Sequence, residues 1–265
     1  MTDPSADFVV PEAWLDLAHA LADAARPVAR RYFRQPLEII AKADESPVTI
    51  ADREIEQAMR ALIEARFPDH GIFGEEFGRT REDAPVQWVL DPIDGTQAFI
   101  TGMPIFGTLI AACYQGRPVL GVVDQPILEE RWVGAAGHPS TFQGAPIHTS
   151  GCADPGGATL YSTHPDMFAG LGRAEDYGRL TAAVKRTRFG GDCYAYGLLA
   201  SGWADLVVEA MLQPYDYCAL GPIVEGAGGA VSDWAGDPLT ITSDGTVVAA
   251  ASPALNVAAR GLLNR

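Results

Sequence analysis

Cysteine and basic residues are both scarce in this chain. There are four cysteines among 265 residues, at positions 113, 152, 193 and 218, and no CxxC pair. Such spacing does not build a disulfide scaffold, so we expect free thiols. The 19 basic residues are outnumbered by 34 acidic ones, which gives a net charge of −15. Because no basic footprint is available, neither a nucleic acid nor an anionic membrane is expected as a partner.

Long apolar runs are absent as well. The longest, Met103–Tyr114, is short and is interrupted by Gly107 and Thr108. A membrane span is therefore not expected. The first residues include acids but no basic segment, unlike a secretory signal peptide. These absences favour a cytoplasmic protein.

The motifs of several common enzyme classes are missing. The sequence has no GxSxG elbow, no GxxxxGK[ST] loop and no GxGxxG after a predicted strand. This argues against a serine hydrolase, a P-loop enzyme and a dinucleotide-binding fold. The five histidines lack HExxH or similar spacing, so a zinc site is not expected.

Hydrophobic periodicity indicates helices first and strands next in the N-terminal half. Apolar residues at steps of three and four predict one helix from Pro11 toward Pro36 and a second over about 51–67. Short apolar runs typical of strands follow, with a hairpin turn at 116–118. The strand candidates are 72–74, 86–90, 104–114, 119–123 and 131–133.

The segment 134–157, rich in glycine, proline and histidine, indicates a boundary between two halves. Beyond it we expect strands at 158–162, 186–189, 204–210, 230–233 and 246–251, and helices at 193–202, 216–226 and from 253 onward. The simplest arrangement is an α/β fold, a layered α+β sandwich with a mixed sheet in each half. We expect residues 1–140 and 141–265 to form the two halves and to pack as one unit.

Carboxylates follow the apolar strands at several points. Glu75 and Glu76 come directly after the run 72–74, and Asp91 follows the run 86–90. Asp216 stands at the start of an apolar helix. Each acid alone could be a helix cap or a solvated side chain. Together they indicate a site, since strand ends are where α/β folds place their chemistry.

The segment Asp91–Thr96, with the sequence DPIDGT, has the properties of a metal and phosphate site. A turn at Pro92 can bring the two aspartates together and aim the carbonyl of Ile93 at the same point. Gly95 allows close backbone approach, and the N–H groups of Gly95 and Thr96 at a helix start can bind an anion. Carboxylate and carbonyl oxygens are ligands that suit Mg²⁺ or Mn²⁺.

These residues resemble the signatures of the inositol monophosphatase superfamily. The stretch 88–96, preceded by Gly74–Glu76, is similar to its first signature, and Asp216 with the run 225–229 is similar to its second. Within the superfamily, the stretches 99–110, 190–197 and 214–217 look like the histidinol-phosphate phosphatase branch. Tyr215 stands where inositol phosphatases usually have tryptophan, which counts against an inositol phosphate as substrate.

The resemblance implies a set of site residues. Two or three Mg²⁺ ions, or Mn²⁺ as a substitute, would be bound by Glu75, Asp91, the Ile93 carbonyl, Asp94 and Asp216. Asp52 and Thr96 would orient the attacking water, with Glu75 as a further catalytic residue. Substrate would be bound by Asp94, Gly95, Thr96, Asp192 and Glu209. The resemblance also implies a homodimer.

Asp192 and Glu209 bear on the choice of substrate. Inositol phosphatases generally have a small neutral residue at the position of Asp192, which here could also simply cap a helix. Two acids near the leaving alcohol would favour a cationic substrate through charge-assisted hydrogen bonds. We therefore expect a small phosphorylated substrate, L-histidinol phosphate, hydrolysed by metal-activated water. The alternatives are an inositol-1-phosphate or other sugar-phosphate phosphatase, a nucleotide 3′-phosphatase, and a non-catalytic metal- and phosphate-binding regulator.

Overall fold

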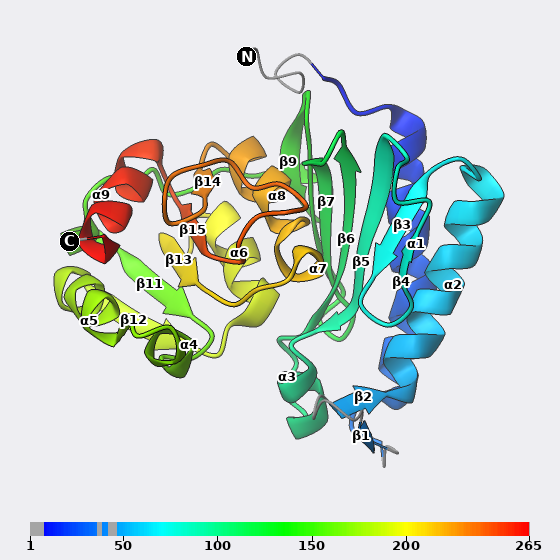
Figure 1. The fold of residues 1–265 in the computed structure, drawn as a ribbon, viewed down its shortest axis with the longest axis horizontal. Coiled ribbons are helices and arrows are strands. Elements are labelled where there is room, and N and C mark those ends of the chain that lie inside the picture. Colours follow the sequence, from blue (N-terminus) through cyan, green and yellow to red (C-terminus); the bar gives the residue numbers. More distant parts are fainter. Residues whose placement is uncertain (1–7, 36–38, 42–46, 265) are drawn as a thin grey trace.

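The computed structural model describes residues 8–35, 39–41 and 47–264. Two β-sheets stand side by side, with helices between them and on both outer faces (Figure 1). Near α3, the strands β1 (Ile39–Ala41) and β2 (Pro47–Thr49) pair with each other. The expected layered α/β sandwich with two mixed sheets is confirmed.

The larger sheet has the strand order β10-β9-β8-β7-β6-β5-β3-β4. Its β3 and β5 are parallel, and its other neighbouring strands are antiparallel. The strands are β3 (Gly71–Gly74), β4 (Gly78–Thr80), β5 (Val86–Asp94), β6 (Gly107–Tyr114), β7 (Arg117–Gln125), β8 (Glu130–Ala135), β9 (His138–Phe142) and β10 (Ala145–Pro146).

Two long helices cover the outer face of the larger sheet, α1 (Glu12–Tyr32) and α2 (Ile50–Arg66). Both were expected from their spacing. The buried side of α1 carries Trp14, Leu17 and Leu21, that of α2 carries Ile55 and Met59, and these pack with the sheet in one core cluster. Residues 42–46 lie outside the described residues, and Asp52 lies in the first turn of α2.

The smaller sheet has the order β12-β11-β13-β15-β14. In it, β11 runs parallel to β12 and β13, while β15 is antiparallel to β13 and β14. Its strands are β11 (Thr159–Ser162), β12 (Arg186–Phe189), β13 (Leu206–Glu209), β14 (Ala230–Ser232) and β15 (Val247–Ala250). The outer helices are α4 (Asp166–Gly170), α5 (Ala174–Ala183) and α9 (Pro253–Leu263), and a short 3₁₀ turn, η1, covers Pro155–Gly157.

The helices between the sheets are α6 (Asp192–Ala200), α7 (Pro214–Tyr217) and α8 (Leu220–Gly226). The continuous helix expected at 216–226 is wrong, because the chain is divided between α7 and α8 at positions 218 and 219. A core cluster that draws on both sheets surrounds these helices. The division into halves near residue 140 stays a prediction. The larger sheet ends with β10, and α8 of the later half packs on β7 and β8.

The contact between α8 and the larger sheet is made backbone to backbone. Gly121 of β7 and Gly134 of β8 are opposite each other in the sheet. A Cβ atom at Gly121 would lie 1.8 Å from the carbonyl oxygen of Ala219, and one at Gly134 would lie 2.4 Å from the Cα of Ile223. Heavy atoms cannot approach so closely, so both positions require glycine for α8 to pack there.

One expected turn takes a different form. Asp91 and Asp94 both belong to β5, whose pairing with β6 is irregular between them. Pro92 cannot donate a ladder hydrogen bond, which fits a bulge at this point. The Thr108 hydroxyl donates instead to the Pro92 carbonyl, at 2.8 Å.

Among the residues described, no helix has both the length and the apolar character needed to cross a membrane.

Candidate active site

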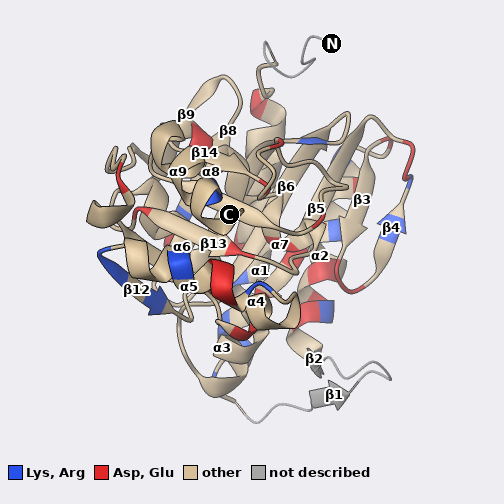
Figure 2. Cartoon of the chain, turned by 60° about the vertical axis from the view of Figure 1, so that its left-hand side comes forward, with Lys and Arg blue, Asp and Glu red and all other residues tan. Residues whose placement is uncertain are grey.

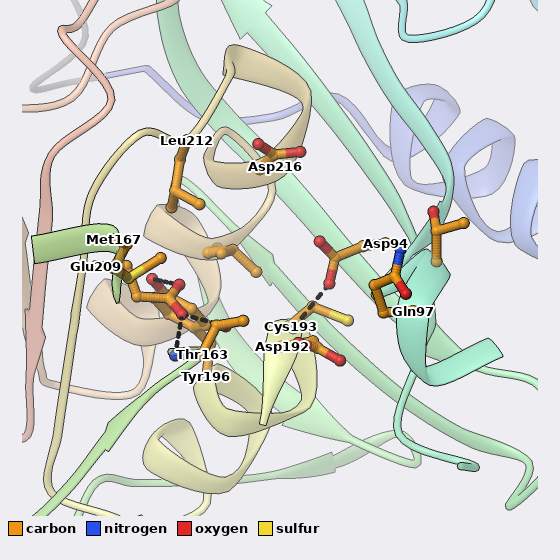
Figure 3. Close-up of a pocket in the computed structure, with 13 residues that line it drawn as sticks. Asp94, Gln97, Thr163, Met167, Asp192, Cys193, Tyr196, Glu209, Leu212 and Asp216 are labelled. Carbon is orange, nitrogen blue, oxygen red and sulfur yellow. Dashed lines mark hydrogen bonds between the residues drawn. The ribbon is translucent and has the colours of Figure 1, made fainter. Parts of the chain in front are cut away.

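Three carboxylates meet where β5 faces α7. Oxygen atoms of Asp91, Asp94 and Asp216 all lie within 4.8 Å of one another. Asp94 and Asp216 point into a cavity between the two sheets (Figure 3). The structure thus brings together three of the predicted ligands. Asp94 and Asp216 are more than 120 positions apart in the sequence.

Asp216 is held by the start of its own helix. It lies in the first turn of α7, which begins at Pro214, and its Oδ2 accepts the backbone N–H of Gln213 at 2.6 Å. A carboxylate at this position complements the unpaired N–H groups of a helix N-terminus. One carboxylate oxygen is therefore anchored, and the side chain is fixed relative to β5.

Glu75 joins the cluster from the neighbouring strand. It occupies the turn between β3 and β4, and its N–H donates to the carbonyl of Leu90 at 3.2 Å. Because β3 and β5 are parallel, with Gly74 opposite Leu90, Glu75 lies beside Asp91, and its charge raises the pKa of Asp91. The fourth predicted carboxylate ligand is therefore in place.

The pKa values of these carboxyl groups show how crowded the negative charge is. Burial, followed by neighbouring carboxylates, raises the pKa of Glu75 to about 7. Burial likewise raises the pKa of Asp216 to about 7, and the pKa values of Asp91 and Asp94 lie well above the usual range for the same reasons. A bound cation would reverse these shifts, since it favours the ionised form.

The donors fit a hard metal ion. The Oδ1 atom of Asp91 is buried and has no hydrogen-bond partner among the described residues. A buried carboxylate oxygen without a partner destabilises the folded state unless a ligand binds to it. Oxygen-only donors suit Mg²⁺, Mn²⁺ or Ca²⁺ rather than a soft metal. The cluster can therefore hold a metal ion.

The predicted water-orienting residues are Asp52 and Thr96. Asp52 is buried, and its charge contributes to the raised pKa of Glu75. The Thr96 hydroxyl donates to the carbonyl of Ile93 at 3.1 Å. That carbonyl oxygen retains a second lone pair for a further partner. A working pair of Asp52 and Thr96 stays a prediction.

Gly95 and Asp192 lie in contact with each other in the lining of the cavity. Gly95 precedes α3 (Thr96–Thr101) with a φ of +79°, and a Cβ atom there would lie 2.7 Å from Oδ2 of Asp192. Asp192 does not cap α6: Gly191 occupies the cap position, and Asp192 is the first residue of the helix, with a φ of +43°. Burial raises the pKa of its carboxyl group, and Thr163 acts in the opposite direction.

Glu209 is held at the other end of the cavity by three donors. It accepts the Thr163 N–H at 3.0 Å, the Thr163 hydroxyl at 2.5 Å and the Tyr196 hydroxyl at 2.8 Å. Burial raises its pKa despite these bonds. Sequence reasoning missed Thr163 and Tyr196, and also Cys193, whose N–H donates to Oδ2 of Asp94 at 2.8 Å. Nothing in their spacing distinguishes them from ordinary core residues.

The cavity measures about 260 Å³, and both acidic and apolar side chains line it. Met167, Leu212 and Leu220 form part of its wall (Figure 3). No lysine or arginine is among the described residues that line it. The basic residues of β12 lie at the edge of the smaller sheet instead (Figure 2). A phosphate entering this cavity would therefore need metal cations to offset the carboxylates.

The chain is similar to several known proteins. The sequence pattern described as the Inositol monophosphatase family matches residues 11–263. The chain is 48% identical over 247 residues to the bifunctional phosphatase IMPL2, chloroplastic, of Arabidopsis thaliana, covering 92% of this chain and 70% of that protein. It is 37% identical over 236 residues to a histidinol-phosphatase of Chlorobaculum parvum, covering 89% and 91%. The solved structure of an inositol monophosphatase from Zymomonas mobilis superposes with a TM-score of 0.88 at 49% identity, covering 96% of this chain and 98% of that one.

Proposed function

This chain belongs to the inositol monophosphatase family of phosphatases, and from that premise we propose that it hydrolyses L-histidinol phosphate to L-histidinol and phosphate with Mg²⁺. The observation that carries the proposal is that four carboxylates line one cavity. Asp94 and Asp216 belong to the predicted metal site, while Asp192, in contact with Gly95, and Glu209 belong to the rest of the lining. A substrate with a phosphate and a cationic group matches that distribution once metal ions are bound.

The chemistry of phosphate-ester hydrolysis needs positioning and charge neutralisation more than a covalent nucleophile. Bound Mg²⁺ would supply a water of lowered pKa and stabilisation of the leaving alkoxide. In this proposal the ligands are Glu75, Asp91, the Ile93 carbonyl, Asp94 and Asp216. Asp52 and Thr96 orient the attacking water, and the N–H groups of Gly95 and Thr96 bind the phosphate.

The remainder of the cavity suits the rest of the substrate. Met167 and Leu212 offer apolar surface for an imidazole ring. The carboxylates of Asp192 and Glu209 would accept charge-assisted hydrogen bonds from the amine or the protonated ring. The relatives named as a histidinol-phosphatase and as a bifunctional phosphatase support this choice. The similarity to an inositol monophosphatase supports the second candidate, an inositol-1-phosphate or other sugar-phosphate phosphatase.

Phosphate release with Mg²⁺ separates the two candidates. We expect kcat/KM for L-histidinol phosphate to exceed that for inositol 1-phosphate by about a hundredfold, since two hydrogen bonds to charged groups contribute roughly 3 kcal/mol and each 1.4 kcal/mol is tenfold in rate. Comparable values for both substrates, or a preference for inositol 1-phosphate, would contradict the proposal. Absence of phosphate release from either would favour the non-catalytic alternative.

The substitution Asp192→Asn should lower kcat/KM for L-histidinol phosphate by about tenfold to a hundredfold, because one hydrogen bond between charged groups is lost. Asparagine accepts the positive φ of this position as readily as aspartate, so the backbone is retained. Hydrolysis of inositol 1-phosphate should not fall. An equal loss on both substrates would remove Asp192 from substrate selection. Asp166→Asn, an exposed aspartate in α4, is the matched control and should change neither rate.

Three further expectations are carried as proposals. A homodimer, a cytoplasmic location and the use of Mn²⁺ in place of Mg²⁺ all derive from the sequence and its resemblance. Of these, the ion substitution is the most direct to measure, since the same phosphate-release assay can be run with either ion.

A further inference from the structure

Glu56 is a buried acid that neither the sequence motifs nor the proposed reaction uses. Its side chain is fully buried in α2, and Oε1 forms an ion pair with Nε of Arg60 at 2.7 Å. Two backbone N–H groups also donate to it, from Glu76 at 2.7 Å and from Phe77 at 3.2 Å. Burying a carboxylate requires such partners, and these two belong to the turn that carries Glu75.

The same turn is held at its far end by the ion-pair partner of Glu56. The Nη2 atom of Arg60 donates to the carbonyl of Gly78, the first residue of β4. Two side chains one helical turn apart on α2 therefore bond to the backbone of three consecutive residues, 76 to 78. This leaves the turn after Glu75 little freedom to move.

Gly74 shows that the fit is tight. A Cβ atom on Gly74 would lie 1.9 Å from Oε1 of Glu56. Gly74 is also the residue directly before Glu75 and is opposite Gly78 in the β3–β4 pair. The carboxylate of Glu56 thus sits against the backbone on both sides of Glu75.

Helix α2 also carries Asp52, four residues before Glu56 and hence on the same helix face. One helix therefore presents the predicted water-orienting acid directly and fixes the loop of a predicted metal ligand through Glu56. In the proposed reaction, Glu75 binds the metal ion and Asp52 orients its water. The same helix, α2, positions both residues.

We propose that Glu56 is a positioning residue: it fixes the Glu75 carboxylate for metal binding by anchoring the backbone N–H groups of Glu76 and Phe77. The inference rests on the metal site of the proposed function but not on the identity of the substrate. The substitution Glu56→Gln keeps the shape and one acceptor oxygen but loses the charge and directs an amide NH₂ toward backbone donors.

The test is binding of Mg²⁺ to the full metal-depleted chain, measured by isothermal titration calorimetry. We expect Glu56→Gln to weaken Mg²⁺ binding by about tenfold or more, the usual effect of removing a group that orients a ligand. Binding within twofold of the wild-type value would overturn the inference. Because the experiment measures Mg²⁺ binding, it tests the positioning role of Glu56 whether or not L-histidinol phosphate is the substrate. Wild-type protein that binds no Mg²⁺ would overturn the metal site and this inference with it.

The matched control is Asp124→Asn. Asp124 is equally buried and is bonded to Arg26 at 2.6 Å and to Arg131 at 2.6 Å, away from the acidic cluster. It should lose stability as Glu56→Gln does but bind Mg²⁺ as the wild type does. An equal loss of Mg²⁺ affinity in this control would show that the effect is general destabilisation and would overturn the proposal.

A second variant serves if Glu56→Gln does not fold. In Gly74→Ala, both carboxylates remain, but the added methyl group occupies the position of the Glu56 oxygen and must displace it. We expect the same loss of Mg²⁺ affinity in this variant. Wild-type affinity in folded Gly74→Ala would contradict the positioning role.

Discussion

Replacing Asp94 with asparagine should reduce phosphate release from L-histidinol phosphate about a thousandfold while the protein still folds. The proposed role of Asp94 is to bind metal beside the phosphate, and a metal Lewis acid contributes several kcal/mol to the transition state, where each 1.4 kcal/mol is tenfold in rate. The oxygen of asparagine can still accept the N–H of Cys193, which keeps the local structure. The measurement is kcat at saturating Mg²⁺.

The same variant has a second expected property that serves as its control. The raised pKa of Asp94 means that its ionised form is unfavourable in the folded metal-free protein, first through burial and then through the charges of Asp192 and Asp216. Removing that charge should raise the melting temperature of the metal-free chain. A variant that retains more than a tenth of the wild-type rate would refute the metal-binding role of Asp94.

Stripping the metal from the protein should leave it less stable at pH 8 than at pH 6.5. Glu75 and Asp216 have folded-state pKa values of about 7, above the ordinary values of 4.5 and 3.8. A carboxyl group with a raised folded-state pKa binds its proton more tightly in the folded state. It therefore contributes stability at low pH that is lost as the pH rises through about 7. The expected loss across this interval is on the order of 1–2 kcal/mol for the two groups, with Asp91 and Asp94 acting in the same direction.

The interval begins at pH 6.5 because two histidines act oppositely below it. Burial lowers the pKa values of His19 and His70 below 6.5, so their contribution to stability is lost as the pH falls. Denaturant unfolding at both pH values, with EDTA and with saturating Mg²⁺, is the measurement. Mg²⁺ should remove the loss, because the ion favours the ionised carboxylates. Metal-free protein that is more stable at pH 8 would contradict the pKa shifts.

Much of the fold could be predicted because its apolar patterns are local. The spacing on α1 and the run that becomes β5 are visible without any tertiary information. The break between α7 and α8 could not be predicted, since Cys218 and Ala219 are compatible with a helix and keep helical backbone angles even at the break. Four further elements could not be predicted because few of their residues are buried, which leaves no clear apolar pattern. These are the helices α4 and α5, which are polar and contain glycine, and the strands β9 and β10.

The candidate site follows the same rule. The acids of β5 are conspicuous because they end an apolar run, so Asp91 and Asp94 could be identified directly. Glu56 looks like half of a solvent-exposed pair with Arg60 at helical spacing, and its burial depends on a turn 20 residues away. Thr163 is distinguished only by where β11 ends relative to Glu209. Groups that act through tertiary contacts have no local signal.

The backbone contact of α8 with Gly121 and Gly134 limits how far the predicted metal ligands can move relative to one another. Side chains can change rotamer to accommodate a different neighbour, but peptide groups in direct contact cannot. Asp216 is attached to this contact through α7, while Asp91 and Asp94 belong to the sheet on its other side. The main chain therefore fixes the backbone positions from which these carboxylates extend. We expect the metal site of the proposed function to prefer ions of one radius for that reason.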